Sequence, residues 1–239
     1  MDLILEGIKK AFWLLIHMDN EVMRITLLSL KVSGLATFIS LALGIPLGTV
    51  LALSRFPGRG IIISLVNTSM GLPPVVVGLF VTIMLWRGGP LAVLHLLYTP
   101  SAMVIAQTII AAPIITGLSL AAIQQLDPKL LLQIKALGAS RLQMGWFLLR
   151  EARLPLLAAM MAGFGGVISE IGASIMVGGN ILGHTRVLTT ATVMETSKGN
   201  FDTAIALGLL LLLLAYSINF TLTIIQQREA FYGRAHFRG

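Results

Sequence analysis

Apolar residues fill most of this chain in runs that are long enough to cross a lipid bilayer. Runs without Lys, Arg, Asp or Glu, or with a single acid in one case, cover residues 32–53, 60–86, 88–126, 154–185 and 203–227. A helix needs roughly 20 mostly apolar residues to cross the hydrocarbon core. The third run is too long for one crossing. Because its first part, GGPLAVLHLLYTP, has turn residues at both ends, we predict an outer loop or a short re-entrant helix there.

These runs predict an all-α integral membrane protein with five transmembrane helices. We place the spans at about 24–54, 60–86, 101–123, 154–179 and 203–227, within one transmembrane domain of residues 24–227. In residues 3–17 the apolar side chains fall near one another on a helix and the charged ones elsewhere, which predicts an interfacial helix within residues 1–23. Residues 228–239 form the predicted tail.

Small residues and prolines mark special points inside the predicted spans. Gly44 and Gly48 form a small-xxx-small pair, which predicts a close approach of two helices. Pro73, Pro74 and Pro113 free backbone carbonyls in mid-span, so they either kink a helix or line a pathway. The sequence does not choose between these two uses.

One sizeable charged island lies between the apolar runs, at residues 127–155, with five Lys or Arg and two acids. Ten Lys or Arg fall on the side of this island and six on the other. Cytoplasmic loops carry an excess of Lys and Arg, so we place the island in the cytoplasm. The N-terminus is then outside and the C-terminus inside.

The island carries the signals of two short helices. Asp127 followed by Pro128 predicts a helix start, and Gly138 predicts its end, because glycine readily adopts the left-handed conformation that closes a helix. Ser140 is a second N-cap candidate, for a helix that runs to about Arg150. Two short helices at an angle would form a polar knob.

This knob, followed by Leu154 and Pro155, resembles the cytoplasmic coupling loop (the EAA loop) of type I ABC importer permeases. The resemblance implies a coupling loop at residues 127–153 that contacts a separate ATPase subunit. The contact residues it implies are Lys135, Ala136, Leu137, Gly138, Ala139, Ser140 and Arg141. Residues 132–134, Leu-Gln-Ile, stand where the family has Glu-Ala-Ala, and the spacing from Gly138 to Pro155 is longer than usual. The alternative is an ordinary amphipathic connector.

A second segment narrows the resemblance to the molybdate, tungstate and sulfate permeases. Residues 169–173, Ser-Glu-Ile-Gly-Ala, resemble their Glu-aromatic-Gly-Ala segment, and the downstream NILGHTRVLTTAT fits the tungstate branch best. The implied function is import of a tetrahedral oxyanion, with tungstate preferred over molybdate or sulfate. The implied setting is a homodimer in a prokaryotic plasma (inner) membrane, supplied by an extracytoplasmic anion-binding protein. The translocation path implied by the family is lined by Pro73, Pro74, Gly166, Ser169, Gly172 and Ala173.

Two charged residues fall inside the predicted spans, Lys31 and Glu170. Such residues are costly in a membrane and usually face a partner or a wet cavity. Counting 1.5 Å per residue places both at a similar depth toward the outer face. We therefore predict a structural ion pair between them, within or between subunits. An anion-guiding role of Lys31 is the alternative.

Composition excludes several other classes of function. With 56% hydrophobic and 11% charged residues the chain is no ordinary soluble domain. The net charge of +7 lies in loops and at span ends, which indicates membrane topology and not nucleic-acid binding. The sequence contains no Gly-Lys pair, which excludes a Walker A loop. Its four His residues show no metal-ligand spacing, and it has no Cys. We therefore expect no cofactor, no metal and no catalytic set. An ion-gradient-driven transporter with Lys31 and Glu170 as relay remains the rival, although no inverted repeat is visible.

Overall fold

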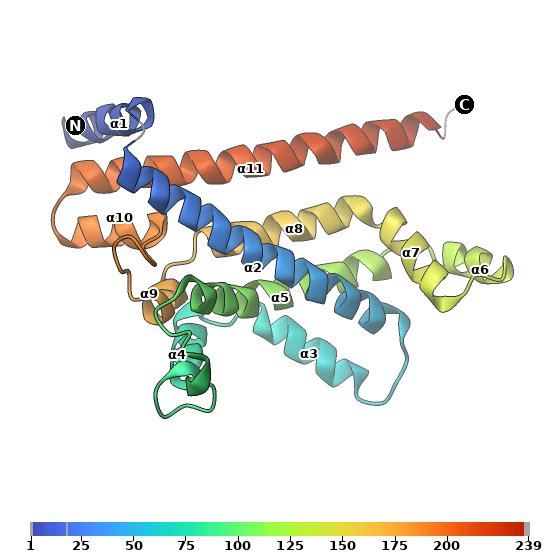
Figure 1. The fold of residues 1–239 in the computed structure, drawn as a ribbon. Helices are drawn as coiled ribbons and strands as arrows, with labels where there is room; N and C mark the ends of the chain where they lie inside the picture. Colours follow the sequence, from blue (N-terminus) through green and yellow to red (C-terminus); the bar gives the residue numbers. More distant parts are fainter. Residues whose placement is uncertain (1, 18, 237–239) are drawn as a thin grey trace.

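The computed structural model describes residues 2–17 and 19–236, and over these ranges the protein is helical without strands (Figure 1). Its elements, in chain order, are α1 (Asp2–Ile16), α2 (Asn20–Leu53), α3 (Arg59–Ser69), α4 (Pro74–Leu85), the 3-10 helix η1 (Ala92–Leu94), α5 (Pro100–Gln124), α6 (Pro128–Ala136), α7 (Arg141–Glu151), α8 (Arg153–Ile168), α9 (Gly172–Gly178), α10 (Leu188–Ser197) and α11 (Phe201–His236). The predicted all-α class is confirmed.

Three helices are long and apolar enough to cross a membrane, namely α2, α5 and α11. They run lengthwise through the molecule, with α6 and α7 at one end and α4, α9 and α10 toward the other (Figure 1). Two further pairs pass the same test only together, α3 with α4 and α7 with α8, and they bend by 103° and 75°. The described residues therefore offer three spans, or up to five if each bent pair counts as one.

The predicted span at 60–86 is not one continuous helix. It breaks between Ser69 and Pro74, and Pro73 has extended backbone angles of φ −62° and ψ 124°. Proline lacks the N–H that an α-helix needs and disfavours helical angles in the residue before it, so two successive prolines end α3 and restart the chain as α4. The sequence left open whether Pro73 and Pro74 kink a helix or line a pathway, and the structure shows a sharp bend at these residues.

The predicted span at 154–179 is also broken, between Ile168 at the end of α8 and Gly172 at the start of α9. A continuous helix would join the N–H groups of Ala173 and Ser174 to the carbonyls four residues earlier. Here both N–H groups bond the carboxylate of Glu170 instead, at 2.7 and 3.0 Å. The freed carbonyl of Glu170 accepts a hydrogen bond from Thr189 Oγ1 at 3.1 Å. The side chain of Glu170 therefore replaces helical hydrogen bonds and stabilises the break.

The core lies where α2 crosses α5. Gly44 and Gly48 are both buried in this crossing, and Cβ atoms added there would lie 2.9 Å from Ile115 Cγ2 and 2.6 Å from the carbonyl oxygen of Thr116. Real side-chain contacts are almost never this short, so only glycine allows the two backbones to approach so closely. The close helix approach predicted from the small-xxx-small pair is confirmed.

The N-terminal helix α1 docks against the start of α11. Ala11 and Leu14 are buried with Ala206, and Lys10 Nζ lies 2.6 Å from Asp202 Oδ2. A helix within residues 1–23 was predicted, and its place in the membrane interface stays a prediction. The structure adds that one face of this helix packs against α11 of the same chain.

Two features near the C-terminus were not predicted. The short helix α10 lies between α9 and α11, in a region where the sequence has no clear helix signal. Helix α11 also continues beyond residue 227 to His236, so the described part of the predicted tail is an extension of that helix.

Candidate functional site: the knob, the α4–α9 contact and a pocket beyond α4

The knob formed by α6 and α7 is built as the local sequence signals predict. Asp127 Oδ1 accepts a hydrogen bond from the N–H of Lys129 at 2.8 Å at the start of α6. Gly138 has φ +77° between the two helices. Ser140 and Gln143 form a reciprocal capping box, in which Ser140 Oγ accepts from the N–H of Gln143 and Gln143 Oε1 accepts from the N–H of Ser140. The helix starts and the break between them are confirmed.

The knob has a buried side and an exposed apolar side. Ile134, Leu148 and Ala152 are buried together with Ile123 of α5 and Leu156 of α8, which fixes the knob to the ends of these helices. On the outside Leu132, Leu137, Leu142 and Trp146 remain exposed. Leu137 and Leu142 are 86% and 89% exposed.

At the other end of the molecule the structure brings together four of the six residues predicted to line a path. Pro73 and Pro74 begin α4, and Gly172 and Ala173 begin α9, which packs against α4. A Cβ at Gly78 would lie 2.7 Å from Ala173 Cα, and one at Gly172 would lie 2.7 Å from Val75 Cγ2. The two short helices are therefore in backbone contact at their N-terminal halves.

The other two predicted path residues lie at the end of α8. Ser169 is exposed, and its hydroxyl donates to the carbonyl of Gly165 at 2.8 Å. Gly166 is half-buried, and a Cβ there would meet only Ile114 Cδ1, at 3.7 Å. All six residues thus flank the two helix breaks, and their lining of a path stays a prediction.

The ion pair predicted between Lys31 and Glu170 does not form within the chain. Lys31 is exposed on α2, whereas Glu170 is 6% exposed. The Glu170 carboxylate accepts from the N–H groups of Ala173 and Ser174 and from the hydroxyl of Ser174, at 2.7, 3.0 and 2.9 Å. Three such donors stabilise a buried carboxylate without a cation. The prediction of a pair within the chain was wrong because it assumed a continuous helix, which would have no free N–H groups to offer. A pair between two subunits stays a prediction.

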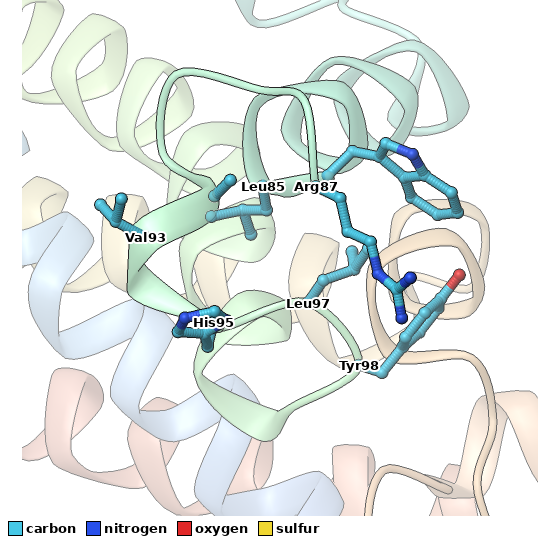
Figure 2. A pocket seen from close by; sticks show the side chains of 8 residues that line it. Leu85, Arg87, Val93, His95, Leu97 and Tyr98 are labelled. Carbon is cyan, nitrogen blue, oxygen red and sulfur yellow. The ribbon is translucent and has the colours of Figure 1, made fainter.

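A pocket of about 770 Å³ lies beyond the end of α4, and sequence reasoning missed it (Figure 2). The residues that line it are Leu85, Trp86, Arg87, Ala92, Val93, His95, Leu97 and Tyr98. Figure 2 shows the Arg87 side chain extending toward Tyr98, with His95 across the pocket. Arg87 forms no ion pair in the described parts of the chain. Most of the pocket lining is apolar. Arg87 adds one cation that is free to meet an acidic group.

Backbone strain and a direct link to α9 distinguish this pocket. His95 and Tyr98 have φ values of 48° and 63°, which are rare for residues other than glycine and often mark functional sites. The N–H of Tyr98 donates to the carbonyl of Val177 in α9 at 2.8 Å. The only signal in the sequence was the turn residues at both ends of GGPLAVLHLLYTP, which predict a loop but no cavity.

Relatives of known description match this chain along most of its length. A tungstate uptake system permease protein from Peptoclostridium acidaminophilum is 40% identical, over 95% of this chain and all of its own. A protein of the same description from Campylobacter jejuni is 35% identical over 92% of each chain. A probable anion ABC transporter permease protein from Haloferax volcanii is 42% identical, over 82% of this chain and 86% of its own.

Solved structures show the same fold at lower identity. A chain of the MetNI methionine ABC transporter, in an inward-facing conformation, aligns with a TM-score of 0.71 at 20% identity, over 88% of this chain and 97% of its own. A chain of a bacterial ABC transporter that imports alginate aligns with a TM-score of 0.73 at 19% identity, over 86% of this chain and 79% of its own. The fold that the resemblance to type I importer permeases implied is confirmed.

The family match covers residues 44–230, which include both helix breaks, the knob and the pocket. Its members are transporter subunits and not enzymes, and membership implies an ATPase and a binding protein as partners. On this match, and on relatives at 35 to 42% identity, the chain belongs to the family described as the binding-protein-dependent transport system inner membrane component.

Proposed function

We propose that this chain is the membrane subunit of an ABC importer for a tetrahedral oxyanion, with tungstate as its preferred substrate. The observation that carries the proposal is the 40% identity to a tungstate uptake permease over 95% of the chain. A second tungstate uptake permease supports it at 35% identity, whereas a molybdenum permease from Escherichia coli is 29% identical over 79% of the chain. Import of molybdate or sulfate is the alternative within the same type.

The knob is the part of the chain that we assign to the ATPase subunit. Its exposed leucines, Leu137 and Leu142, flank the turn at Gly138 and offer apolar anchors next to polar groups. Such anchors in a polar rim are typical of protein interfaces. The excess of Lys and Arg on this side supports a place for the knob in the cytoplasm, where ATP is available.

The pocket beyond the end of α4 is the part that we assign to the extracytoplasmic binding protein. It lies at the opposite end of α5 from the knob, and α5 with 25 residues is long enough to separate the two by the full membrane. Apolar walls with a free Arg87 suit an apolar side chain flanked by a carboxylate on the partner. Through Tyr98 the pocket contacts α9 directly.

A second copy of the chain would complete the pathway. Helices α3 and α4 leave large apolar side chains exposed, among them Ile61, Leu65 and Phe80. These residues belong to the two helices on either side of the break at Pro73 and Pro74, which we place on the path. We therefore propose a homodimer in which the breaks of both copies face a shared axis.

The test is tungstate uptake by vesicles that hold this chain with its ATPase subunit and binding protein. We expect uptake to require ATP and to be inhibited by molybdate and sulfate only at higher concentrations. Stronger uptake of molybdate or sulfate would reassign the substrate. Uptake driven by an ion gradient without the ATPase would favour a secondary transporter and refute the proposal.

A turn variant tests the ATPase contact. Gly138→Val should abolish co-purification of the ATPase subunit, because a β-branched residue tolerates a φ of +77° poorly and the two knob helices would reorient. Gly183→Val is the matched control, since Gly183 has φ +75° and equally open surroundings but lies in the loop between α9 and α10. Equal ATPase binding by both variants would contradict the coupling role of the knob.

A further inference from the structure

The described structure contains a buried hydrogen-bond chain that the proposed function does not use. Gln107 Nε2 on α5 donates to Ser174 Oγ on α9 at 3.2 Å, and Ser174 Oγ donates to Glu170 Oε2 at 2.9 Å. A hydroxyl has one hydrogen, and the carboxylate can only accept, so the direction of this chain is fixed from Gln107 to Glu170. All three residues are at most 6% exposed. Hydrogen bonds to a charged group in such an environment are strong.

Glu170 is the point where four elements are joined. Its carboxylate holds the first turn of α9, the hydroxyl of Ser174 extends this contact to α5, and its carbonyl accepts from Thr189 on α10. The same turn of α9 is in backbone contact with α4 through Gly78 and Ala173. Helix α9 is therefore joined to α5 by a directed bond and to α4 by a contact that leaves no space for a side chain, and the break before it is bonded to α10.

Helix α8, on the other side of the break, is held differently. It packs on α5 through Gly163 and Ile115, and the hydrogen bonds it accepts from other helices lie near its ends, from Ser33 to Val167 at 3.5 Å and from Gln226 to Leu154 at 3.1 Å. Apolar contacts of this kind allow small sliding movements of packed helices. At its first residue α8 is continuous with α7 of the knob, through a bend of 75°.

We infer that Glu170 is a positioning residue that keeps α9 with α4 and α5 while α8 moves together with the knob. Residues 169–171 are then the hinge between a fixed outer segment and a moving inner one. This inference rests on the proposed function, because it assigns the movement to the ATPase cycle. Loss of Glu170 should separate ATP hydrolysis from transport without unfolding the protein.

The first readout is the number of tungstate ions imported per ATP hydrolysed by the complete transporter in lipid vesicles. Glu170→Gln keeps the side-chain size but removes the charge and replaces one acceptor oxygen by a donor. We expect this ratio to fall by about fivefold or more, because fivefold is the lower end of the effect that one site of a protein ordinarily has on another to which it is coupled. Ser174→Ala should lower it in the same direction, because it removes the link to Gln107.

Thr185→Val is the matched structural control. Thr185 is fully buried beyond the other end of α9, where its hydroxyl accepts from the N–H of Ile181 at 2.9 Å and donates to the carbonyl of Gly178. The valine has nearly the same shape, so it removes buried hydrogen bonds without touching the hinge. We expect this variant to lower the amount of folded protein and to leave the ratio of transport to hydrolysis unchanged.

The second readout is independent of the substrate. The chain has no cysteine, so Ser169→Cys places a single thiol at the exposed hinge position. With Glu170 present, the rate at which a membrane-impermeant maleimide labels this thiol in the complex with the ATPase should differ between the ATP-free and ATP-bound states. With Glu170→Gln in addition, we expect this difference to disappear.

The two readouts separate failure of the inference from failure of the proposed function. If the unmodified transporter imports no oxyanion, the proposed function fails, and the maleimide labelling alone decides the role of Glu170. If Glu170→Gln behaves like Thr185→Val, with less folded protein but normal ATP-dependent labelling, Glu170 serves stability only. That outcome overturns the inference.

Discussion

The crossing of α2 and α5 permits a quantitative prediction for Gly48→Ala. A Cβ at this position would lie 2.6 Å from the carbonyl oxygen of Thr116 and 2.9 Å from the backbone nitrogen of Leu120. Ordinary contacts begin at 3.4 Å, so the closest approach is about 0.8 Å too short. Both neighbours belong to the backbone of α5 and cannot rotate away. The substitution therefore has to move the two helices apart.

The expected magnitude is a balance of two opposing terms. Overpacking a tight contact costs about 1–3 kcal/mol. Replacing glycine by alanine inside a helix contributes up to about 1 kcal/mol in the opposite direction. Gly34→Ala is the matched control, because Gly34 lies in the same helix and a Cβ there would meet nothing within 4 Å. The difference between the two variants isolates the overpacking cost of about 1–3 kcal/mol.

Thermal unfolding in lipid or mild detergent measures this difference. For a chain of this size each kcal/mol shifts the unfolding midpoint by about 2–4 °C. We therefore expect Gly48→Ala to unfold about 2–12 °C below Gly34→Ala. A midpoint for Gly48→Ala equal to or above that of Gly34→Ala would show that α2 and α5 are not in backbone contact, and would refute the reasoning.

Two further predictions concern α10. Ser29→Ala leaves the buried N–H of Leu188 without the acceptor that Ser29 Oγ provides at 2.8 Å, so it should destabilise the fold by about 1–3 kcal/mol in thermal unfolding. The exposed Ser217→Ala, which loses only a bond within α11, should have little effect, and equal effects would count against the α2–α10 link. The side chains of Asn200 and Lys198 hold the pKa of Glu195 below its usual value of 4.5. A lowered pKa stabilises the fold at neutral pH, and this contribution is lost as the pH falls through the folded-state pKa. Glu195→Gln should therefore unfold at a lower temperature than the unmodified chain at pH 7 and at nearly the same temperature in acid, and a pH-independent gap would argue against it.

The sequence predicted the parts of the fold that depend on neighbours in the chain. Asp127, Gly138 and Ser140 act within four residues of their own positions, and each occupies the place that its capping chemistry predicts. Pro73 and Pro74 likewise break a helix locally. None of these residues specifies the direction in which the chain continues, so the 103° bend between α3 and α4 could not be predicted.

The candidate site was less predictable because its groups find their partners across breaks. The sequence identified Glu170 as a buried charge in need of a partner and assigned it to Lys31 by depth alone. A break in the helix supplied N–H groups three and four residues away, and these satisfy the carboxylate without any cation. The pocket of Arg87, His95 and Tyr98 depends on left-handed residues in a loop, for which a His or Tyr gives no local signal.

The docking of α1 has a consequence for how the protein is made. Lys10 and Asp202 are 192 residues apart in the chain, and the groups that bury Ala11 and Leu14 belong to the first turns of α11. During synthesis α1 leaves the ribosome first, but its partner surface exists only after nearly all other helices have been inserted. The attachment of α1 is therefore a late step of assembly, which can follow only after the first turns of α11 have been made. A chain truncated before Phe201 exposes the buried face of α1 and keeps it available to chaperones or proteases of the membrane.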